Sequence, residues 1–195
     1  MAMTSIIIAT CNGITLTKRC LESIRRCTPE QHEIICVDNG STDGTVDLLQ
    51  SAADIELIEN SVNRGMPAAI NQGLRVAAAD FIVLLNNDVV VTPGWLGRML
   101  AILSQDHKIG LVGPCSNNVS GIQCVPTSYR DLSHLDAFAE ANSGRTRNAC
   151  RSQISASSKS SSSLSNAPRS LSACALEALR VMAWRRCLCA GASCR

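Results

Sequence analysis

The sequence has no long apolar run, which excludes a first class of protein. A membrane-spanning helix needs about 18 consecutive apolar residues, and no stretch of the 195 residues reaches that length. The start of the chain is apolar only from Ile6 to Ala9 and lacks the basic and longer apolar regions of a signal peptide. We therefore expect a cytoplasmic protein without an integral membrane segment, and leave open a peripheral position at the inner face of the membrane.

Acidic residues are almost absent from the end of the chain. Residues 1–144 hold 9 Lys/Arg and 15 Asp/Glu, a net charge of −6, whereas residues 145–195 hold 9 Lys/Arg and only Glu177, a net charge of +8. The latter segment has 12 serines and no strand pattern, and only Leu176 to Trp184 could form a short helix. It lacks the apolar content that would offset the entropy of ordering. We therefore predict a domain over residues 1–144 and a disordered or out-of-frame Ser/Arg/Cys-rich tail over residues 145–195.

Two interpretations of this tail stay open. A bias toward Ser, Arg, Ala and Cys is typical of GC-rich coding DNA read in a wrong frame, so the tail could be an out-of-frame end that leaves the domain truncated. Alternatively, it is a genuine basic segment for an anionic partner.

The 11 cysteines lack the paired spacing of metal ligands. Six are scattered over the predicted domain and five crowd into the tail. We interpret most of the six as buried thiols that pack as small apolar side chains. Cys187, Cys189 and Cys194 have no partner pair or histidine nearby, which disfavours a zinc site.

Apolar runs alternate with helical patterns over the first 112 residues. The predicted strands are Thr4 to Ala9, Ile34 to Val37, Ile55 to Ile58, Phe81 to Leu85 and Ile109 to Val112. The predicted helices run from Leu16 to Cys27, from Thr45 to Ser51, from Pro67 to Ala78, and through Leu103 after an N-cap and first-turn pair at Thr92-Pro93. The strand runs are continuous, as in strands buried on both faces. This pattern predicts a three-layer α/β fold with a mostly parallel sheet.

Polar residues follow three of these strands. They are Thr10, Asn12 and Gly13 in the first loop, Asp38 and Ser41 to Asp43 in the second, and Asn86 to Asp88 in the third. The carboxyl ends of parallel strands share one edge of a sheet, where ligands bind. Asp38 could there accept hydrogen bonds from a nucleobase or ribose, and Asp88 suits a hard divalent cation. An ordinary turn and a strand cap, respectively, remain the alternatives.

Four motifs together resemble the family 2 glycosyltransferases. They are Ile-Ile-Ala-Thr-Cys-Asn-Gly at 7–13, Val-Asp-Asn-Gly-Ser-Thr-Asp-Gly-Thr at 37–45, Asn-Arg-Gly at 63–65 and Leu-Leu-Asn-Asn-Asp at 84–88. The match covers roughly residues 3–143, with the motifs in the family's order and spacing. The resemblance implies a GT-A fold and inverting transfer of a sugar from a nucleotide-diphospho-sugar.

The resemblance also implies roles for single residues. The nucleotide-binding set would be Thr10, Asn12, Asp38, Arg64 and Asn87, with Asp38 and the Thr10 region on the nucleobase, commonly uracil. A solvated surface position is the alternative for Arg64.

The metal site implied by the resemblance is Asp88. It would be the metal-binding end of the DXD-type motif, with Mg²⁺ or Mn²⁺ bridging the diphosphate and neutralising the departing nucleoside diphosphate. The chain departs from the family pattern at Ala9 and Cys11, where Pro and Tyr are usual, and at Asn86, which leaves one carboxylate in the motif.

A general base is the part of the expected machinery that we do not find. Inverting transfer needs a base to deprotonate the acceptor hydroxyl, and the resemblance places an acidic cluster roughly a hundred residues after Asp88, where Glu177 is the only acid. We therefore expect transfer from a UDP- or dTDP-linked sugar to a saccharide, lipid-linked saccharide or protein acceptor, in a chain that lacks the base. No nucleic-acid partner is expected.

Two other functions remain open. One is a non-catalytic nucleotide-binding module. The other is a nucleotidyltransferase, which should show a Gly-rich, basic triphosphate loop after the first strand. Cys11-Asn12-Gly13 is too short for that loop and has no basic cluster beside it.

Overall fold

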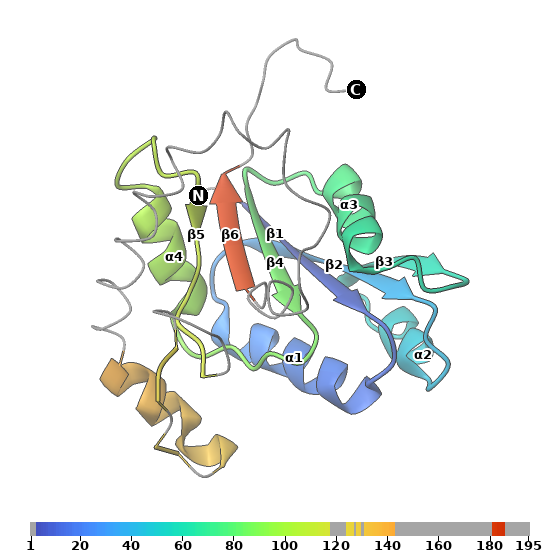
Figure 1. The fold of residues 1–195 in the computed structure, drawn as a ribbon, viewed down its shortest axis with the longest axis horizontal. Coiled ribbons are helices and arrows are strands. Elements are labelled where there is room, and N and C mark those ends of the chain that lie inside the picture. Colours follow the sequence, from blue (N-terminus) through green and yellow to red (C-terminus); the bar gives the residue numbers. More distant parts are fainter. Residues whose placement is uncertain (1–2, 118–123, 127, 130, 143–180, 186–195) are drawn as a thin grey trace, which may run out of the picture.

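Six strands form one sheet in the order β3-β2-β1-β4-β6-β5 (Figure 1). The computed structural model describes residues 3–117, 124–126, 128–129, 131–142 and 181–185. The strands are β1 (Thr4–Thr10), β2 (His32–Asn39), β3 (Ile55–Asn60), β4 (Phe81–Asn86), β5 (Leu111–Val112) and β6 (Val181–Arg185). The helices are α1 (Ile14–Cys27), α2 (Thr45–Gln50), α3 (Met66–Val76) and α4 (Trp95–Leu103). A short 3-10 helix, η2 (Leu132–His134), follows them and leads into a helix over residues 135–142. The predicted α/β fold with a mostly parallel sheet is confirmed, because β3, β2, β1 and β4 are all parallel to their neighbours in that set.

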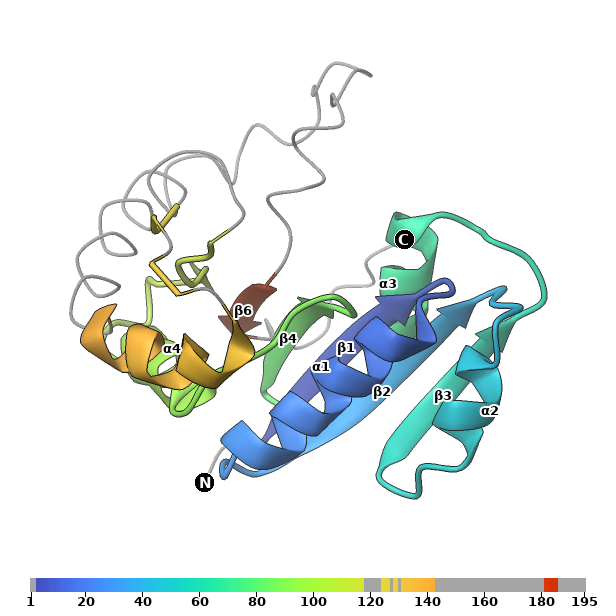
Figure 2. The ribbon, with the colours of Figure 1, turned by 90° about the horizontal axis from the view of Figure 1, so that it is seen from below.

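The sheet is the middle of three layers. One face packs against α1, α2 and α4, through side chains such as Ile6, Ile24, Leu49 and Leu96. The other face packs against α3, through a smaller cluster that includes Ala69. Figure 2 shows α3 on the opposite side of the sheet from α1 and α2. Alternate residues of β1 therefore enter different cores, which explains why its isoleucines are consecutive.

Helix α3 lies unusually close to the sheet at Gly73. A Cβ atom at this position would lie 2.5 Å from Cγ2 of Ile7 and 3.4 Å from Cγ2 of Val37. The missing side chain therefore lets the helix backbone rest directly on β1 and β2. This contact fixes the height of α3, and with it the loop that leads into the helix.

Strand β6 corrects the prediction for the tail. Val181–Arg185 runs antiparallel to β4 on one side and to β5 on the other, with Val181 opposite Leu85 and Arg185 opposite Phe81. Of the segment from Leu176 to Trp184 that could have formed a short helix, residues 181–184 therefore belong to a strand instead. The rest of the predicted tail lies outside the described residues.

Helix α4 also begins later than predicted. Gly94 occupies the N-cap position with φ 71°, and the helix starts at Trp95. The Trp95 amide donates to the Thr92 carbonyl over 3.2 Å, so Thr92 and Pro93 form the turn before the helix rather than its first residues. Within the part of the chain that the structure describes, no helix combines the length and the apolar character needed to cross a bilayer.

Candidate functional site

Asp38 is a buried carboxylate at the carboxyl end of β2. Its side chain has no solvent exposure, and Oδ2 accepts hydrogen bonds from the backbone amides of Gly40 (3.1 Å) and Ser41 (2.9 Å). Among the described residues, no group donates a hydrogen bond to Oδ1. A buried acceptor without a donor is unfavourable by about 1–3 kcal/mol. Oδ1 is therefore a position where a ligand N–H would add stability.

The loop after β1 is bound to the loop after β2. The backbone amide of Asn12 donates to Oγ of Ser41 over 2.7 Å, and the backbone amide of Thr42 donates to the side-chain Oδ1 of Asn12 over 2.8 Å. Asn12 itself has a left-handed backbone, with φ 61°, a conformation that asparagine tolerates better than most residues. The predicted site residue Asn12 thus holds two strand-end loops together.

The amino end of α1 is capped by a residue from the second loop. Asp43 accepts a hydrogen bond from the Ile14 amide at Oδ2 (3.0 Å) and from the Thr45 hydroxyl at Oδ1 (2.5 Å). The bond from Thr45 and then that from Ile14 lower the pKa of Asp43 to about 2. The Asp43 carboxylate therefore occupies the position at the amino end of α1 where a phosphate could otherwise bind.

Thr10 and Asn87 belong to one internal network. The amide of Asn87 lies 3.2 Å from Oγ1 of Thr10, 3.0 Å from Oγ1 of Thr17 and 3.4 Å from the Asn12 carbonyl. Thr10 and Thr17 are buried. The structure thus brings three predicted residues together, with Thr10 and Asn87 in bonds that join β1, α1 and the β4 loop. Their contact with a nucleotide stays a prediction.

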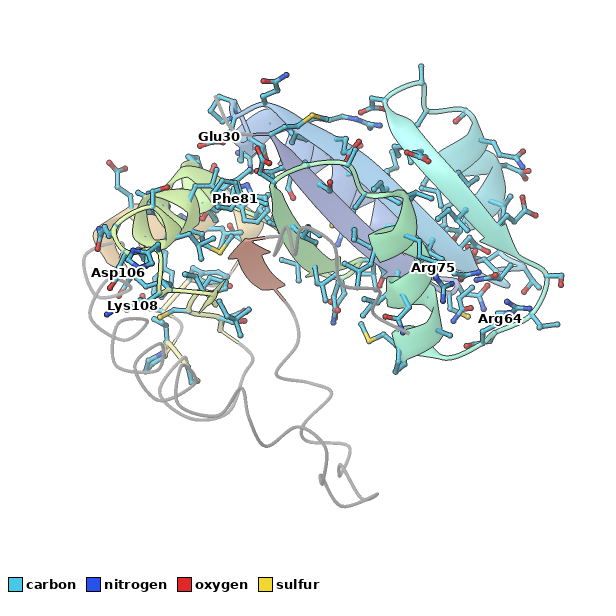
Figure 3. All side chains as sticks on the ribbon, turned by 90° about the horizontal axis from the view of Figure 1, so that it is seen from above. Glu30, Arg64, Arg75, Phe81, Asp106 and Lys108 are labelled. Atoms are coloured by element: carbon cyan, nitrogen blue, oxygen red, sulfur yellow. The ribbon has the colours of Figure 1, made fainter. Side chains whose placement is uncertain are left out.

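Arg64 lies in the loop between β3 and α3 and is exposed. Its backbone amide donates to Oδ1 of Asn39 over 3.0 Å, whereas none of the described residues forms a hydrogen bond or ion pair with its guanidinium. Figure 3 shows Arg64 at the far side of the molecule from Asp106 and Lys108. The predicted cation thus has a fixed backbone and an available side chain.

Four amide side chains around this loop were missed as site residues. Asn39 donates to Oδ1 of Asn63 over 2.9 Å, and Asn60 donates to Oδ1 of Asn39 over 3.3 Å. Asn60 and Gln72 exchange two hydrogen bonds of 2.8 Å. The sequence signal was an amide after each strand end, Asn39 after Asp38 and Asn60 at the end of β3, but their pairing depends on the neighbouring positions of β2 and β3.

Asn63 also contacts the loop after β1. Its Nδ2 lies 3.4 Å from the sulfur of Cys11, which is exposed. Because β2 lies between β1 and β3 in the sheet, a contact between the residues that follow β1 and β3 passes over the end of β2. At that end of β2, Asn63 also accepts a hydrogen bond from Asn39 over 2.9 Å.

Asp88 is exposed, two residues beyond β4. The pKa of Cys20 is raised to about 12, first by burial of the thiol and then by the negative charge of Asp88. Over the described ranges, no group of three or more His, Cys, Asp and Glu side chains could hold a metal ion. Asp88 would therefore be a single carboxylate ligand, which fits a hard cation only if a ligand such as a diphosphate supplies further oxygens.

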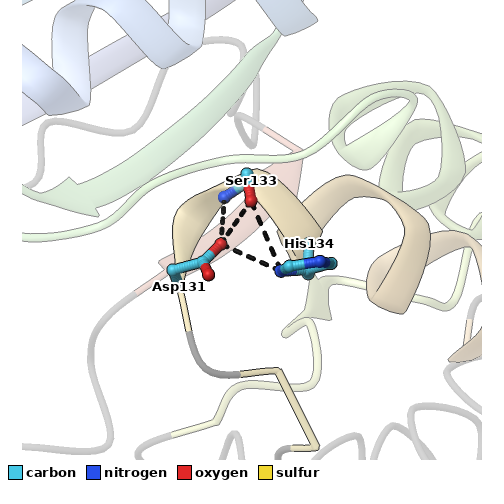
Figure 4. A network of polar contacts seen from close by, with 3 residues as sticks. All are labelled: Asp131, Ser133 and His134. Atoms are coloured by element: carbon cyan, nitrogen blue, oxygen red, sulfur yellow. Dashed lines mark hydrogen bonds and ion pairs between the residues drawn. The ribbon is translucent and has the colours of Figure 1, made fainter.

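A Ser-His-Asp group beyond β5 resembles a catalytic triad but is a helix cap (Figure 4). Oδ1 of Asp131 accepts bonds from the Ser133 amide (2.9 Å) and the Ser133 hydroxyl, and lies 2.9 Å from Nδ1 of His134. The Ser133 hydroxyl lowers the pKa of Asp131. In a triad the serine and the carboxylate form hydrogen bonds with different ring nitrogens of the histidine, whereas here Ser133 and Asp131 both contact Nδ1 of His134. The group starts η2.

Comparison with known proteins identifies relatives for the domain. A mycobacterial PGL/p-HBAD biosynthesis glycosyltransferase (Mycobacterium bovis) is 31% identical over 115 residues, 56% of this chain and 45% of that protein. The poly(ribitol-phosphate) beta-glucosyltransferase of Bacillus spizizenii is 35% identical over 91 residues, 43% of this chain and 14% of that protein. The matches thus span less than half the length of these relatives.

A solved structure supports the fold. The mannosyltransferase PcManGT of Pyrobaculum calidifontis, in complex with GDP-Man and Mn²⁺, superposes with a TM-score of 0.53 and 26% identity, over 58% of this chain and 35% of that one. The architecture is therefore that of the GT-A glycosyltransferases.

Most of the chain also matches a model of a protein family. The model described as Glycosyl transferase family 2 matches residues 5–147, a range that includes all four strand-end loops described above. The chain therefore belongs to glycosyl transferase family 2.

Proposed function

We propose that this chain binds a nucleotide-diphospho-sugar at the carboxyl edge of β1, β2 and β4, and that it provides the donor site of an inverting glycosyltransferase. The main support for the proposal is that Oδ1 of Asp38 is a buried acceptor to which none of the described residues donates a hydrogen bond. Family membership supports the reaction class.

Asp38 bears on the proposed choice of nucleobase. Uracil and thymine each carry a ring N–H between two carbonyl groups, and a carboxylate accepts a hydrogen bond from it. The corresponding ring nitrogen of cytosine carries no hydrogen. Guanine also carries ring and exocyclic N–H groups from which a carboxylate accepts hydrogen bonds, so Asp38 disfavours only cytosine. The choice of a UDP- or dTDP-linked donor over a GDP-linked one rests on the resemblance to the family, in which uracil is common. Because Asp38 has no exposure, the base reaches Oδ1 only after neighbouring residues move.

The proposed diphosphate position lies between Arg64 and Asp88. The guanidinium of Arg64 supplies a positive charge at the edge of the site, as phosphate recognition requires. Asp88 would hold Mg²⁺ or Mn²⁺ together with the diphosphate oxygens. When bound, the cation neutralises charge on the leaving nucleoside diphosphate.

The acceptor side of the reaction needs a group that we do not assign. The base expected from the family would fall within residues 176–195, of which the structure describes 181–185. Residues 176–195 hold one acid, Glu177, and we propose that this residue does not supply the base. On this proposal the chain binds the donor without completing transfer, which is also the behaviour of a non-catalytic nucleotide-binding module. A nucleotidyltransferase is disfavoured because the Asp43 carboxylate caps α1.

Calorimetric titration of UDP, dTDP, GDP and CDP, with and without Mn²⁺, tests the proposal. We expect UDP or dTDP to bind more tightly than CDP. In Asp38→Asn, the acceptor that faces the base is lost, and affinity should fall by about 10- to 150-fold, from about 1.5–3 kcal/mol for a hydrogen bond to a charged group. In Asp88→Asn, the Mn²⁺ dependence should disappear.

Three outcomes would contradict the proposal. No binding of any nucleotide to the folded protein would remove the donor site. Unchanged affinity in Asp38→Asn would remove the role of that carboxylate. Preference for GDP, the nucleotide in the PcManGT complex, would overturn the choice of UDP or dTDP.

A further inference from the structure

The loop that carries Arg64 is held at two consecutive backbone amides. The Arg64 amide donates to Oδ1 of Asn39 over 3.0 Å, and the Gly65 amide donates to Oδ1 of Asn63 over 2.8 Å. Gly65 has φ 84° and ψ 153°, a conformation that is essentially restricted to glycine. The backbone on both sides of the Arg64 Cα is therefore fixed, while the guanidinium forms no hydrogen bond or ion pair with the described residues.

The two acceptors are themselves held by other parts of the fold. Asn39 is 4% exposed, lies in β2 directly after Asp38, and donates its own amide to Oδ1 of Asn63 over 2.9 Å. Its Oδ1 also accepts from Asn60, which forms the two-way pair with Gln72 of α3. The network thus reaches from the strand that bears the base-binding carboxylate to the helix that follows the loop.

The hydrogen bonds of Asn39 are directed at one loop rather than spread over the fold. Asn39 has one donor group and one acceptor oxygen, and both are directed at the Arg64 loop and its supports. A network whose members are all bonded behaves as a rigid unit. A rigid backbone lowers the entropy cost of binding, because the segment that carries the charged side chain is already ordered before the ligand arrives.

We propose that Asn39 and Asn63 are positioning residues that act through Arg64: they preset its backbone so that the guanidinium meets the diphosphate of the donor. This inference rests on the proposed donor site, and it adds two residues that would not touch the donor themselves. It predicts that the benefit of each asparagine disappears when the guanidinium is absent.

A double-mutant cycle on the full chain tests the coupling. Calorimetry with UDP and Mn²⁺ would compare wild type, Asn39→Asp, Arg64→Ala and the double variant. Asn39→Asp keeps both acceptor functions and replaces the donor to Asn63 with a carboxylate oxygen. We expect Asn39→Asp to bind about tenfold more weakly, and the double variant to match Arg64→Ala within about twofold.

Matched controls separate positioning from folding. Gln105→Glu makes the same amide-to-acid change in an exposed turn next to Asp106, far from Arg64 (Figure 3), and should leave affinity unchanged. If Asn39→Asp does not fold, Asn63→Ala replaces it in the cycle, because Asn63 is exposed. The inference would be overturned if the double variant lost affinity by the product of the two single-variant losses. It would also be overturned if the asparagine variants bound UDP as tightly as wild type.

Hydrogen exchange of the peptide around Arg64 gives a readout without nucleotide. In wild type the Arg64 and Gly65 amides should exchange slowly, and in Asn63→Ala the Gly65 amide should exchange at least about tenfold faster. If wild type shows this protection but binds no nucleotide, the proposed donor site fails and the positioning role fails with it. If wild type binds UDP but neither amide is protected, only the positioning role fails.

Discussion

Replacing Gly73 by alanine should destabilise the domain, although alanine favours helices. The helix preference of alanine over glycine contributes about 1 kcal/mol in favour of the variant. Against it stands the new Cβ, 2.5 Å from Cγ2 of Ile7. Ile7 is buried and β-branched, so this methyl group cannot rotate away without a strained rotamer. Overpacking of this kind typically costs about 1–3 kcal/mol, and we expect a net loss of up to about 2 kcal/mol.

Gly97 in α4 provides a matched control. A Cβ there would also meet a neighbour at 2.5 Å, but that neighbour is Oε1 of Glu30, the end of a flexible side chain. The carboxylate can move aside, so Gly97→Ala should be neutral or stabilised by up to about 1 kcal/mol. Comparison of the two variants isolates the rigidity of the contacted group from the effect of alanine itself.

Urea unfolding followed by circular dichroism measures both changes. The slope of the transition should stay constant, so that the midpoint reports stability. A Gly73→Ala variant as stable as Gly97→Ala would refute the reasoning, since the short contact would then have no energetic consequence. Where Gly73→Ala still folds, lifting α3 also moves Gln72, and UDP binding should weaken with it.

Two further predictions concern reactivity and pH. Cys11 should be alkylated by iodoacetamide in the free protein and protected by UDP with Mn²⁺. Burial raises the pKa of Cys20 and Cys36 to about 12 and should keep both thiols unmodified. Peptide mass spectrometry measures the labelling, and equal labelling of Cys11 with and without UDP would contradict its position in the site. The pKa of Asp43 is lowered from 3.8 to about 2, so its stabilising effect is complete above pH 3.8 and is lost as the pH falls toward 2. Thermal melting should therefore show Asp43→Ala less stable than wild type at pH 6, with a difference that shrinks between pH 4 and 2; a difference independent of pH would contradict the cap.

The parallel half of the fold was predictable because its signals are local. The apolar runs of β1, β2 and β4 need no knowledge of their neighbours, and their two-sided burial follows from the absence of alternation. The polar loops could be placed at one edge because parallel strands share a direction. Asp38 stood out for the same reason, as a carboxylate directly after an apolar run.

The parts that were missed depend on partners far away in the sequence. Val181–Arg185 is a strand because it pairs with β4 and β5, and its own residues give no alternating pattern. Asn60 and Gln72 form their pair only because α3 packs beside β3. The start of α4 was misplaced because Thr92-Pro93 is as suitable for a turn as for a helix start.

The place of β6 in the sheet has a consequence for synthesis of the chain. β4 ends at Asn86, and the strand that pairs with its open side begins only at Val181. At about 5–20 residues per second, a ribosome needs roughly 5–20 s to add the intervening segment. During that interval an apolar strand edge is exposed on the nascent protein, and exposed edges of this kind pair with other chains. Slower elongation after residue 86 should therefore increase aggregation of the newly made protein and its dependence on chaperones.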